Sequence, residues 1–178
     1  MGGGAICQLC LTNVKKTGHK VKNDKGALKM DLEKKLAIMQ NVYAASIAET
    51  VNSYEKLKVL EHIVVKKKER QAQTAPYMNQ QLGIGSIEGV FTGLADIFGC
   101  ANWKVEKTVD GYIATATACK LCALSKKMGG ANPCQGWCLD PMAAMITAVT
   151  NNNVGAEHIT VQSTLMDGDC CTVKIVAG

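Results

Sequence analysis

The strongest constraint on the fold is a change in the hydrophobic period of the sequence. Over residues 27–72 apolar side chains recur every three or four positions, which predicts a long helical stretch with a bend near Asn52 and Ser53. From Trp103 onward the apolar residues alternate, which predicts β-strands. The sequence therefore predicts an α+β domain in which a helical region precedes a sheet.

A second helix is predicted after the first, with Thr74 as its N-cap, a proline in its first turn and Gly99 at its end. Three glycines within it, Gly85, Gly89 and Gly93, are spaced four apart and would share one helix face. Glycine costs about 1 kcal/mol in a helix. Three glycines on one face therefore indicate that another backbone or a ligand approaches that face closely. This spacing fits tight helix packing or, alternatively, a substrate pocket lined by Gly85 and Gly89.

Two Asp-Gly pairs mark hairpin turns in the second half of the chain. Asp110-Gly111 separates two alternating segments, and Asp167-Gly168 separates two more. Helical spacing returns between the hairpins. The prediction is a four-stranded antiparallel sheet with helices on one face, built from strands over 103–109, 112–118, 157–165 and 170–176 and helices over 119–128 and 139–151.

These patterns divide the chain into three regions. Residues 1–26 have no period and are interpreted as a flexible or metal-dependent segment, whose Cys7 and Cys10 could form a metal clip, a redox pair or neither. Residues 27–98 form the helical region and 99–178 the cysteine-rich α+β region, with 27–178 as one folding unit. The sequence shows no export signal, so we expect a reducing, cytoplasmic setting and thiols that are not paired as disulfides.

Charge and hydropathy restrict the partners. The net charge is +5, but the lysine-rich runs lack interleaved aromatic residues, which argues against nucleic-acid binding. No apolar stretch is long enough to span a bilayer, which argues against a membrane partner. The apolar stripe of the first helix is longer than a small domain can cover, so we expect a homo-oligomer, most simply a homodimer, through that helix.

Cysteine spacing points to a site for a metal or a small molecule. The pattern CxxC followed by CxxxC is formed by four residues, which could hold zinc or an iron–sulfur cluster, with Cys171 as a further ligand. These four residues are Cys119, Cys122, Cys134 and Cys138.

Two of the candidates sit at predicted helix starts. Cys119 begins the helix over 119–128, where the positive end of the helix dipole would favour a thiolate. Asp140 precedes Pro141 and is predicted to be an N-cap; as an alternative or an additional role it orients a substrate amine or acts as a general base. Cys170 and Cys171 are adjacent on a strand, so one of them should face the core or the site.

The same residues carry a family resemblance. Cys119, the segment Cys134-Gln135-Gly136-Trp137-Cys138-Leu139-Asp140 and the segment Gly168-Asp169-Cys170-Cys171 resemble the L-2-amino-thiazoline-4-carboxylic acid hydrolase-like family. The resemblance implies an α+β domain and hydrolytic opening of a cyclic amidine-thioether on the way to cysteine. It further implies Cys119 or Cys138 as nucleophile or substrate contact, Asp140 as acid/base or amine anchor, and Cys171 as a binding residue. Lys120 stands where the family often has proline.

The C-terminal outline also resembles the 4-vinyl-reductase-type ligand-binding domain, in which some members hold zinc through cysteine. The glutamate and cysteine of that pattern are replaced here by Val161 or Gln162 and by Thr164. Three interpretations therefore stay open. The chain could be a hydrolase-like enzyme, a small-molecule-binding or redox domain that holds zinc or a cluster, or a structural protein whose cysteines fill the core.

Overall fold

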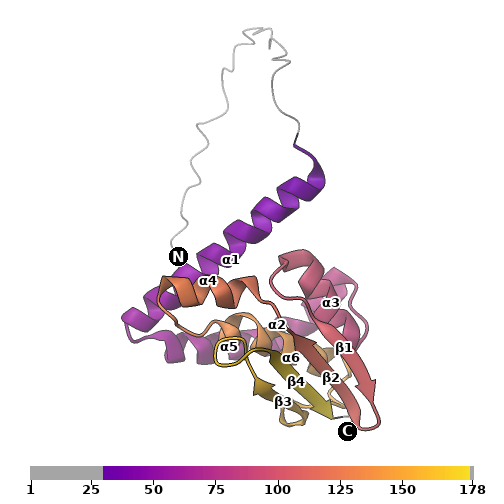
Figure 1. Ribbon diagram of the computed structural model, residues 1–178. Helices are drawn as coiled ribbons and strands as arrows, with labels where there is room; N and C mark the ends of the chain where they lie inside the picture. The colour runs from indigo at the N-terminus through magenta and orange to yellow at the C-terminus, as the bar shows by residue number, and fades with distance from the viewer. Residues whose placement is uncertain (1–29, 177–178) are drawn as a thin grey trace, which may run out of the picture. The chain divides into compact units, whose positions relative to one another are not determined.

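The computed structural model describes residues 30–176 and confirms the predicted α+β class (Figure 1). Six helices and a four-stranded antiparallel sheet make up this part of the chain. The helices are α1 (Leu32–Lys56), α2 (Leu60–Leu82), α3 (Ile87–Phe98), α4 (Lys120–Met128), α5 (Cys134–Trp137) and α6 (Leu139–Val149), and a 3-10 turn, η1 (Ala156–His158), precedes β3. The strands are β1 (Lys104–Thr108), β2 (Gly111–Ala116), β3 (Ile159–Ser163) and β4 (Cys171–Val176).

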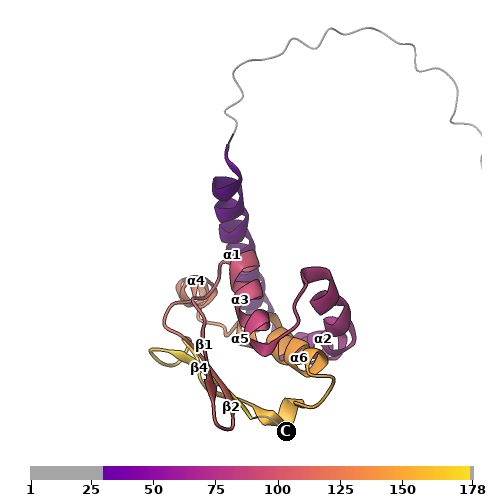
Figure 2. The same ribbon diagram turned by 90° about the vertical axis from the view of Figure 1, so that its right-hand side faces the viewer.

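The sheet has the order β1-β2-β4-β3, and each neighbouring pair is antiparallel. Cys171, Val173 and Ile175 of β4 are buried, whereas the residues between them are only partly covered. The helices lie on the side of the sheet that these buried residues face (Figure 2). Both predicted hairpins are therefore confirmed, and among the described residues all helices lie on one face of the sheet.

The second hairpin differs from the prediction in its turn. Strands over 157–165 and 170–176 were expected around Asp167-Gly168, but β3 ends at Ser163 and β4 begins at Cys171. The register shifts between Val161 and Ser163, which indicates a bulge. The loop between β3 and β4 is held by a hydrogen bond within it: Thr164 Oγ1 donates to Asp167 Oδ2 over 3.1 Å.

The helical boundaries correct two predictions. The first helix ends at Lys56, and the chain turns through Lys58, whose φ is 58°. The second helix, α2, then runs without interruption through Thr74 and Pro76 to Leu82. Thr74 is therefore not an N-cap: its hydroxyl donates to the carbonyl of Arg70, 3.1 Å away, and α2 continues because it packs along α6.

The three spaced glycines do not share one helix face. Gly83 ends α2 in the left-handed conformation, and Gly85 lies in the connection to α3. The N-cap of α3 is Ser86, whose Oγ accepts the N–H of Gly89 at 3.0 Å. The predicted glycine face is wrong because two helix signals, a left-handed glycine and a serine cap, interrupt it. The predicted end of this segment at Gly99 is confirmed.

Two apolar clusters hold the domain together. The larger lies between the sheet and helices α2, α3 and α6, and includes Phe91, Ile146 and Ile175. The smaller lies between α1 and α4, and includes Val51 and Leu121. Helix α1 thus contacts the rest of the domain mainly through its C-terminal half and α4.

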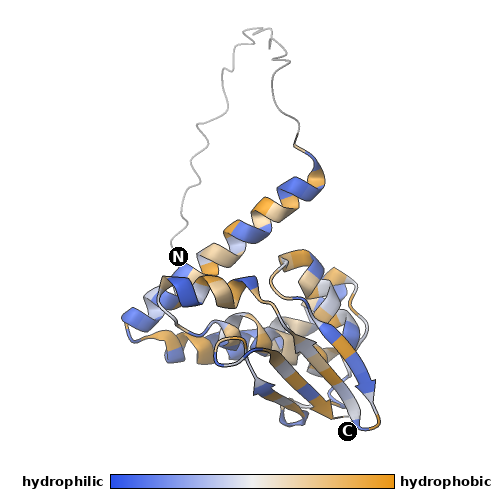
Figure 3. Cartoon of the chain, viewed as in Figure 1, coloured by the Kyte–Doolittle hydropathy of each residue, from blue (hydrophilic) through white to orange (hydrophobic). Residues whose placement is uncertain are grey.

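The N-terminal half of α1 presents apolar side chains to solvent, and hydrophobic residues recur along it in Figure 3. Leu32 is 81% exposed and Met39 64% exposed. The expected homodimer through this helix stays a prediction. Within residues 30–176, no helix combines the length and the apolar character needed to cross a membrane.

Candidate functional site

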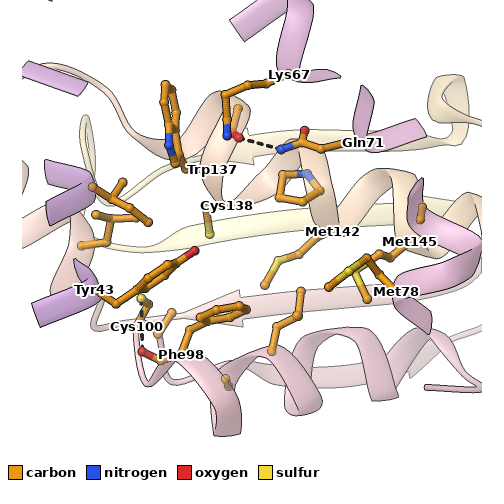
Figure 4. A pocket seen from close by; sticks show the side chains of 18 of the residues that line it. Tyr43, Lys67, Gln71, Met78, Phe98, Cys100, Trp137, Cys138, Met142 and Met145 are labelled. Atoms are coloured by element: carbon orange, nitrogen blue, oxygen red, sulfur yellow. Dashed lines mark hydrogen bonds between the residues drawn. The ribbon is translucent and has the colours of Figure 1, made fainter. Parts of the chain in front are cut away.

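A cavity of about 290 Å³ lies among α1, α2, α3 and the α5–α6 turn. Most of its wall is apolar and rich in sulfur. Figure 4 shows Cys138, Tyr43 and Trp137 around the same space as several methionines. The wall includes Leu94, Phe98, Met78, Met142 and Met145. A concave, mostly apolar space with a few polar groups is the usual form of a small-molecule site.

Cys138 contributes a thiol to this wall from the N-cap position of α6. Burial raises the pKa of Cys138 well above its usual value, and the neighbouring thiols of Cys119 and Cys171 raise it further. Cys100 lies on the same wall, and burial followed by the neighbouring Cys119 thiol raises its pKa to about 11. Both side chains are therefore neutral thiols at neutral pH.

The Tyr43 hydroxyl points toward the Cys138 thiol (Figure 4). Burial raises the pKa of Tyr43, and the nearby Cys100 and Cys138 raise it further. Its ring stacks on Phe98 with 4.8 Å between ring centroids, which fixes the direction of the phenol. Tyr43 is thus a neutral hydrogen-bond donor beside Cys138.

Cationic side chains border the cavity on α2. Lys67 Nζ lies 4.7 Å from the centroid of the Trp137 ring, a cation–π arrangement. Burial lowers the pKa of Lys67, and the neighbouring Arg70 lowers it further. Both Lys67 and Arg70 line the cavity. An anionic group on a ligand would reduce the repulsion between them.

Gln71 adds an acceptor that has no hydrogen-bond partner among residues 30–176. Its Nε2 donates to the carbonyl of Gly136 over 2.7 Å, the contact drawn as a dashed line in Figure 4. Its Oε1 is buried and accepts no hydrogen bond from the described part of the chain. A buried acceptor normally has a donor, so a ligand N–H or an ordered water is the expected partner.

Asp140 supports the turn that carries Trp137 and Cys138. Its Oδ2 accepts the N–H of Gly136 over 2.8 Å, and Lys68 lies 3.8 Å from Oδ1. Gly136 has a φ of 75°, where glycine is favoured. The prediction that Asp140 caps the helix is wrong, because α6 begins at Leu139 with Cys138 as N-cap. The carboxylate lines a separate cavity of about 270 Å³.

Replacing Asp140 tests this supporting role. We expect Asp140→Ala to lower the free energy of unfolding by about 1.5–3 kcal/mol, because it removes a charge-assisted hydrogen bond from a partly buried amide. Asp140→Asn keeps an acceptor oxygen and should lose less than half of that amount. Urea unfolding followed by far-ultraviolet circular dichroism measures both. Equal stability of the two variants would show that Asp140 does not hold Gly136.

Two of the other predicted thiols, Cys119 and Cys122, line a second, wider cavity of about 690 Å³, together with Cys100. Cys134 instead lines the cavity of about 270 Å³ that contains Asp140. Cys119 is the N-cap of α4, and its Sγ accepts the N–H of Cys122 over 3.5 Å. The expected thiolate is nevertheless not favoured: the side-chain hydrogen bond with Cys122 and burial raise the pKa of Cys119. Cys119 and Cys138 therefore lie near one another but face different cavities, and Cys100 borders both.

The four residues of the predicted metal pattern do not form one cluster. Cys122 and Cys134 are in contact, with 3.7 Å between their sulfurs. In the part of the chain that the structure describes, no group of three or more His, Cys, Asp or Glu side chains is arranged to hold a metal ion. Cys171 lies in the core on the covered face of the sheet. Zinc or an iron–sulfur cluster stays a prediction, and Cys7 and Cys10 lie outside the described residues.

Several residues of the cavity were missed by the sequence interpretation. They are Tyr43, Lys67, Gln71 and Cys100. Of these, only Cys100 could have been identified from the sequence, because it directly follows Gly99, which ends a helix. Gly85 and Gly89, predicted to line a pocket, are not on the wall of this cavity. Comparisons with family models, with curated proteins and with solved structures returned no match.

Proposed function

We propose that the protein binds a small anionic heterocycle in the cavity beside Cys138, as a hydrolase-like protein acting on a cyclic amidine. The observation that carries the proposal is the pairing of two features in one cavity. A neutral thiol, Cys138, is on an apolar wall, and two cationic side chains, Lys67 and Arg70, are on the same cavity. A ligand with a carboxylate and an apolar ring complements both features.

The resemblance in the sequence names such a compound, 2-amino-thiazoline-4-carboxylate. Its carboxylate would pair with the cationic Lys67 and Arg70. Its ring would pack against the methionine-rich wall, since thioether side chains adapt to irregular shapes. An amidine N–H could donate to Oε1 of Gln71, which has no partner in the described part of the chain. These three contacts would orient the amidine carbon in the cavity.

The raised pKa of Cys138 shapes the chemistry. Among the described residues that line the cavity there is no Asp, Glu or His to accept the thiol proton. An amidine is itself a base, so the substrate can take that proton as the Cys138 sulfur bonds to the amidine carbon. The ring C–S bond then breaks and releases the substrate thiol. Water cleaves the remaining bond to Cys138, which regenerates the thiol and leaves a urea.

Isothermal titration calorimetry with 2-amino-thiazoline-4-carboxylate, together with detection of the ring-opened product by mass spectrometry, tests the proposal. We expect one site per chain and product only in the presence of the protein. Binding without product would reduce the proposal to a small-molecule-binding domain. No binding would refute it.

Lys67 provides a second test. We expect Lys67→Met to weaken binding of the carboxylate by about tenfold, because one charge-assisted contact of about 1.4 kcal/mol is lost while the aliphatic stem is kept. Lys66→Met is the matched control: Lys66 is the neighbouring lysine, is largely exposed and pairs with Glu69 at 3.0 Å. Equal affinities of the two variants would contradict the role of Lys67.

A further inference from the structure

A pair of buried thiols lies apart from the proposed ligand cavity. Cys122 belongs to the first turn of α4, and Cys134 begins α5. Their sulfurs are 3.7 Å apart, and the two residues are 5% and 4% exposed. Neither residue lines the cavity that contains Cys138. The fold thus brings two thiols from different segments into direct contact inside the domain.

The core cluster to which this pair belongs is rich in soft donors. Nine sulfur-containing side chains belong to the larger core cluster or pack against it. They are Cys119, Cys122, Cys134, Cys138, Cys171, Met78, Met142, Met145 and Met166. Thiolate and thioether sulfur selects Cu(I) over hard cations, which prefer oxygen. An apolar interior with so much sulfur and little oxygen is therefore suited to a soft ion.

The number of available ligands decides which soft ion fits. A structural zinc ion takes four ligands in a tetrahedron. Over residues 30–176, no third His, Cys, Asp or Glu side chain completes such a set. Cu(I) accepts two thiolates in a near-linear arrangement, and the two sulfurs need to separate by only a fraction of an ångström. We propose that Cys122 and Cys134 bind one Cu(I) ion, a property separate from the proposed hydrolase-like function.

Charge and access agree with this site. Binding converts one Cu(I) ion and two thiols into a bis-thiolate complex of charge −1 and releases two protons. Cys122 lies in the first turn of the nine-residue helix α4, whose positive end favours the negative charge of the complex. The hydrogen bond with Cys119 lowers the pKa of Cys122, but the contact with Cys134 and burial outweigh it and raise the pKa, so Cys122 is a neutral thiol until the ion binds. Lys120 and Lys126 line the wide cavity of about 690 Å³ that also reaches Cys122, and this cavity gives the ion an entry path.

Anaerobic Cu(I) titration against a chromophoric Cu(I) chelator tests the site. The full chain carrying Cys7→Ser and Cys10→Ser is used, so that the N-terminal CxxC cannot compete. We expect one equivalent of Cu(I), and an affinity at least about 100-fold weaker when Cys122→Ser or Cys134→Ser is added. The control is Cys170→Ser, which should leave the affinity unchanged, because Cys170 contacts Ser163 and Thr172 instead.

X-ray absorption at the copper edge of the Cys7→Ser/Cys10→Ser protein gives a readout that does not depend on the folding of the core variants. Two sulfur neighbours are expected. Three or four sulfur neighbours would overturn the proposal, as would loss of binding in the Cys7→Ser/Cys10→Ser protein or retained affinity in both core variants. If Cys138→Ser lost Cu(I) binding while the Cys122 and Cys134 variants kept it, the proposal would also be overturned, because the ion would then lie in the ligand cavity. Calorimetry with 2-amino-thiazoline-4-carboxylate on the same proteins separates failure of this site from failure of the proposed function.

Discussion

Cys138→Ala should lower turnover of 2-amino-thiazoline-4-carboxylate by at least about 1000-fold, because the sulfur that bonds to the amidine carbon is removed. The side chain borders the cavity from the N-cap position of α6, next to the Tyr43 hydroxyl. Stopped assays analysed by mass spectrometry measure the rate. Calorimetry on the same variant should show a smaller change in affinity, since the contacts of Lys67 and Gln71 with the ligand remain.

Cys170→Ala is the matched control for this substitution. Cys170 is also a partly exposed cysteine, but its sulfur lies 3.8 Å from Ser163 Oγ and 3.6 Å from Thr172 Oγ1, outside the cavity. We expect less than a twofold change in rate. Equal loss in both variants, or the reverse order, would place the reacting group elsewhere. Thermal unfolding of both proteins separates a loss of chemistry from a loss of folded protein.

The architecture could be predicted from the sequence because it depends on short-range signals. Asp110-Gly111 and the alternating residues around it identified one hairpin, and the left-handed Gly99 identified a helix end. The helix boundaries were harder. Pro76 normally starts or breaks a helix, yet α2 passes through it, because packing against α6 outweighs one lost backbone hydrogen bond. A local pattern cannot report such a tertiary contact.

The candidate site was predicted only in part, for a related reason. Cys138 was found because its motif is local, but the residues around it come from distant segments. Tyr43 is on α1 and Lys67 on α2, and both looked like ordinary helix positions in the sequence. The pattern of four cysteines also implied one cluster, whereas Cys138 and Cys119 face different cavities. Spacing indicates which thiols can meet, but not which wall each one lines.

A polar group in the smaller core has the largest expected effect on stability. Asn52 is 4% exposed between α1 and α4. Its Oδ1 accepts the N–H of Ala131 over 3.0 Å, and its Nδ2 donates to Ser125 Oγ over 3.0 Å. Asn52 thus joins α1 to α4, through Ser125, and to the segment that follows α4, through Ala131. An apolar residue of similar size would leave the Ala131 amide and part of Ser125 without partners.

We expect Asn52→Leu to lower the free energy of unfolding by about 3–5 kcal/mol, since each buried group left unpaired costs about 1–3 kcal/mol and leucine must also fit a site shaped for an amide. The unfolding midpoint should fall by roughly 6–20 °C, at about 2–4 °C per kcal/mol for a chain of this length. Gln40→Leu is the matched control: Gln40 is on the same helix and donates to the carbonyls of Asp96 and Ile97, but it is only partly buried. It should cost less than about 1 kcal/mol. Comparable midpoints for the two variants in calorimetric scans would mean that apolar contacts alone join α1 to α4, and that the Asn52 hydrogen bonds add nothing to them.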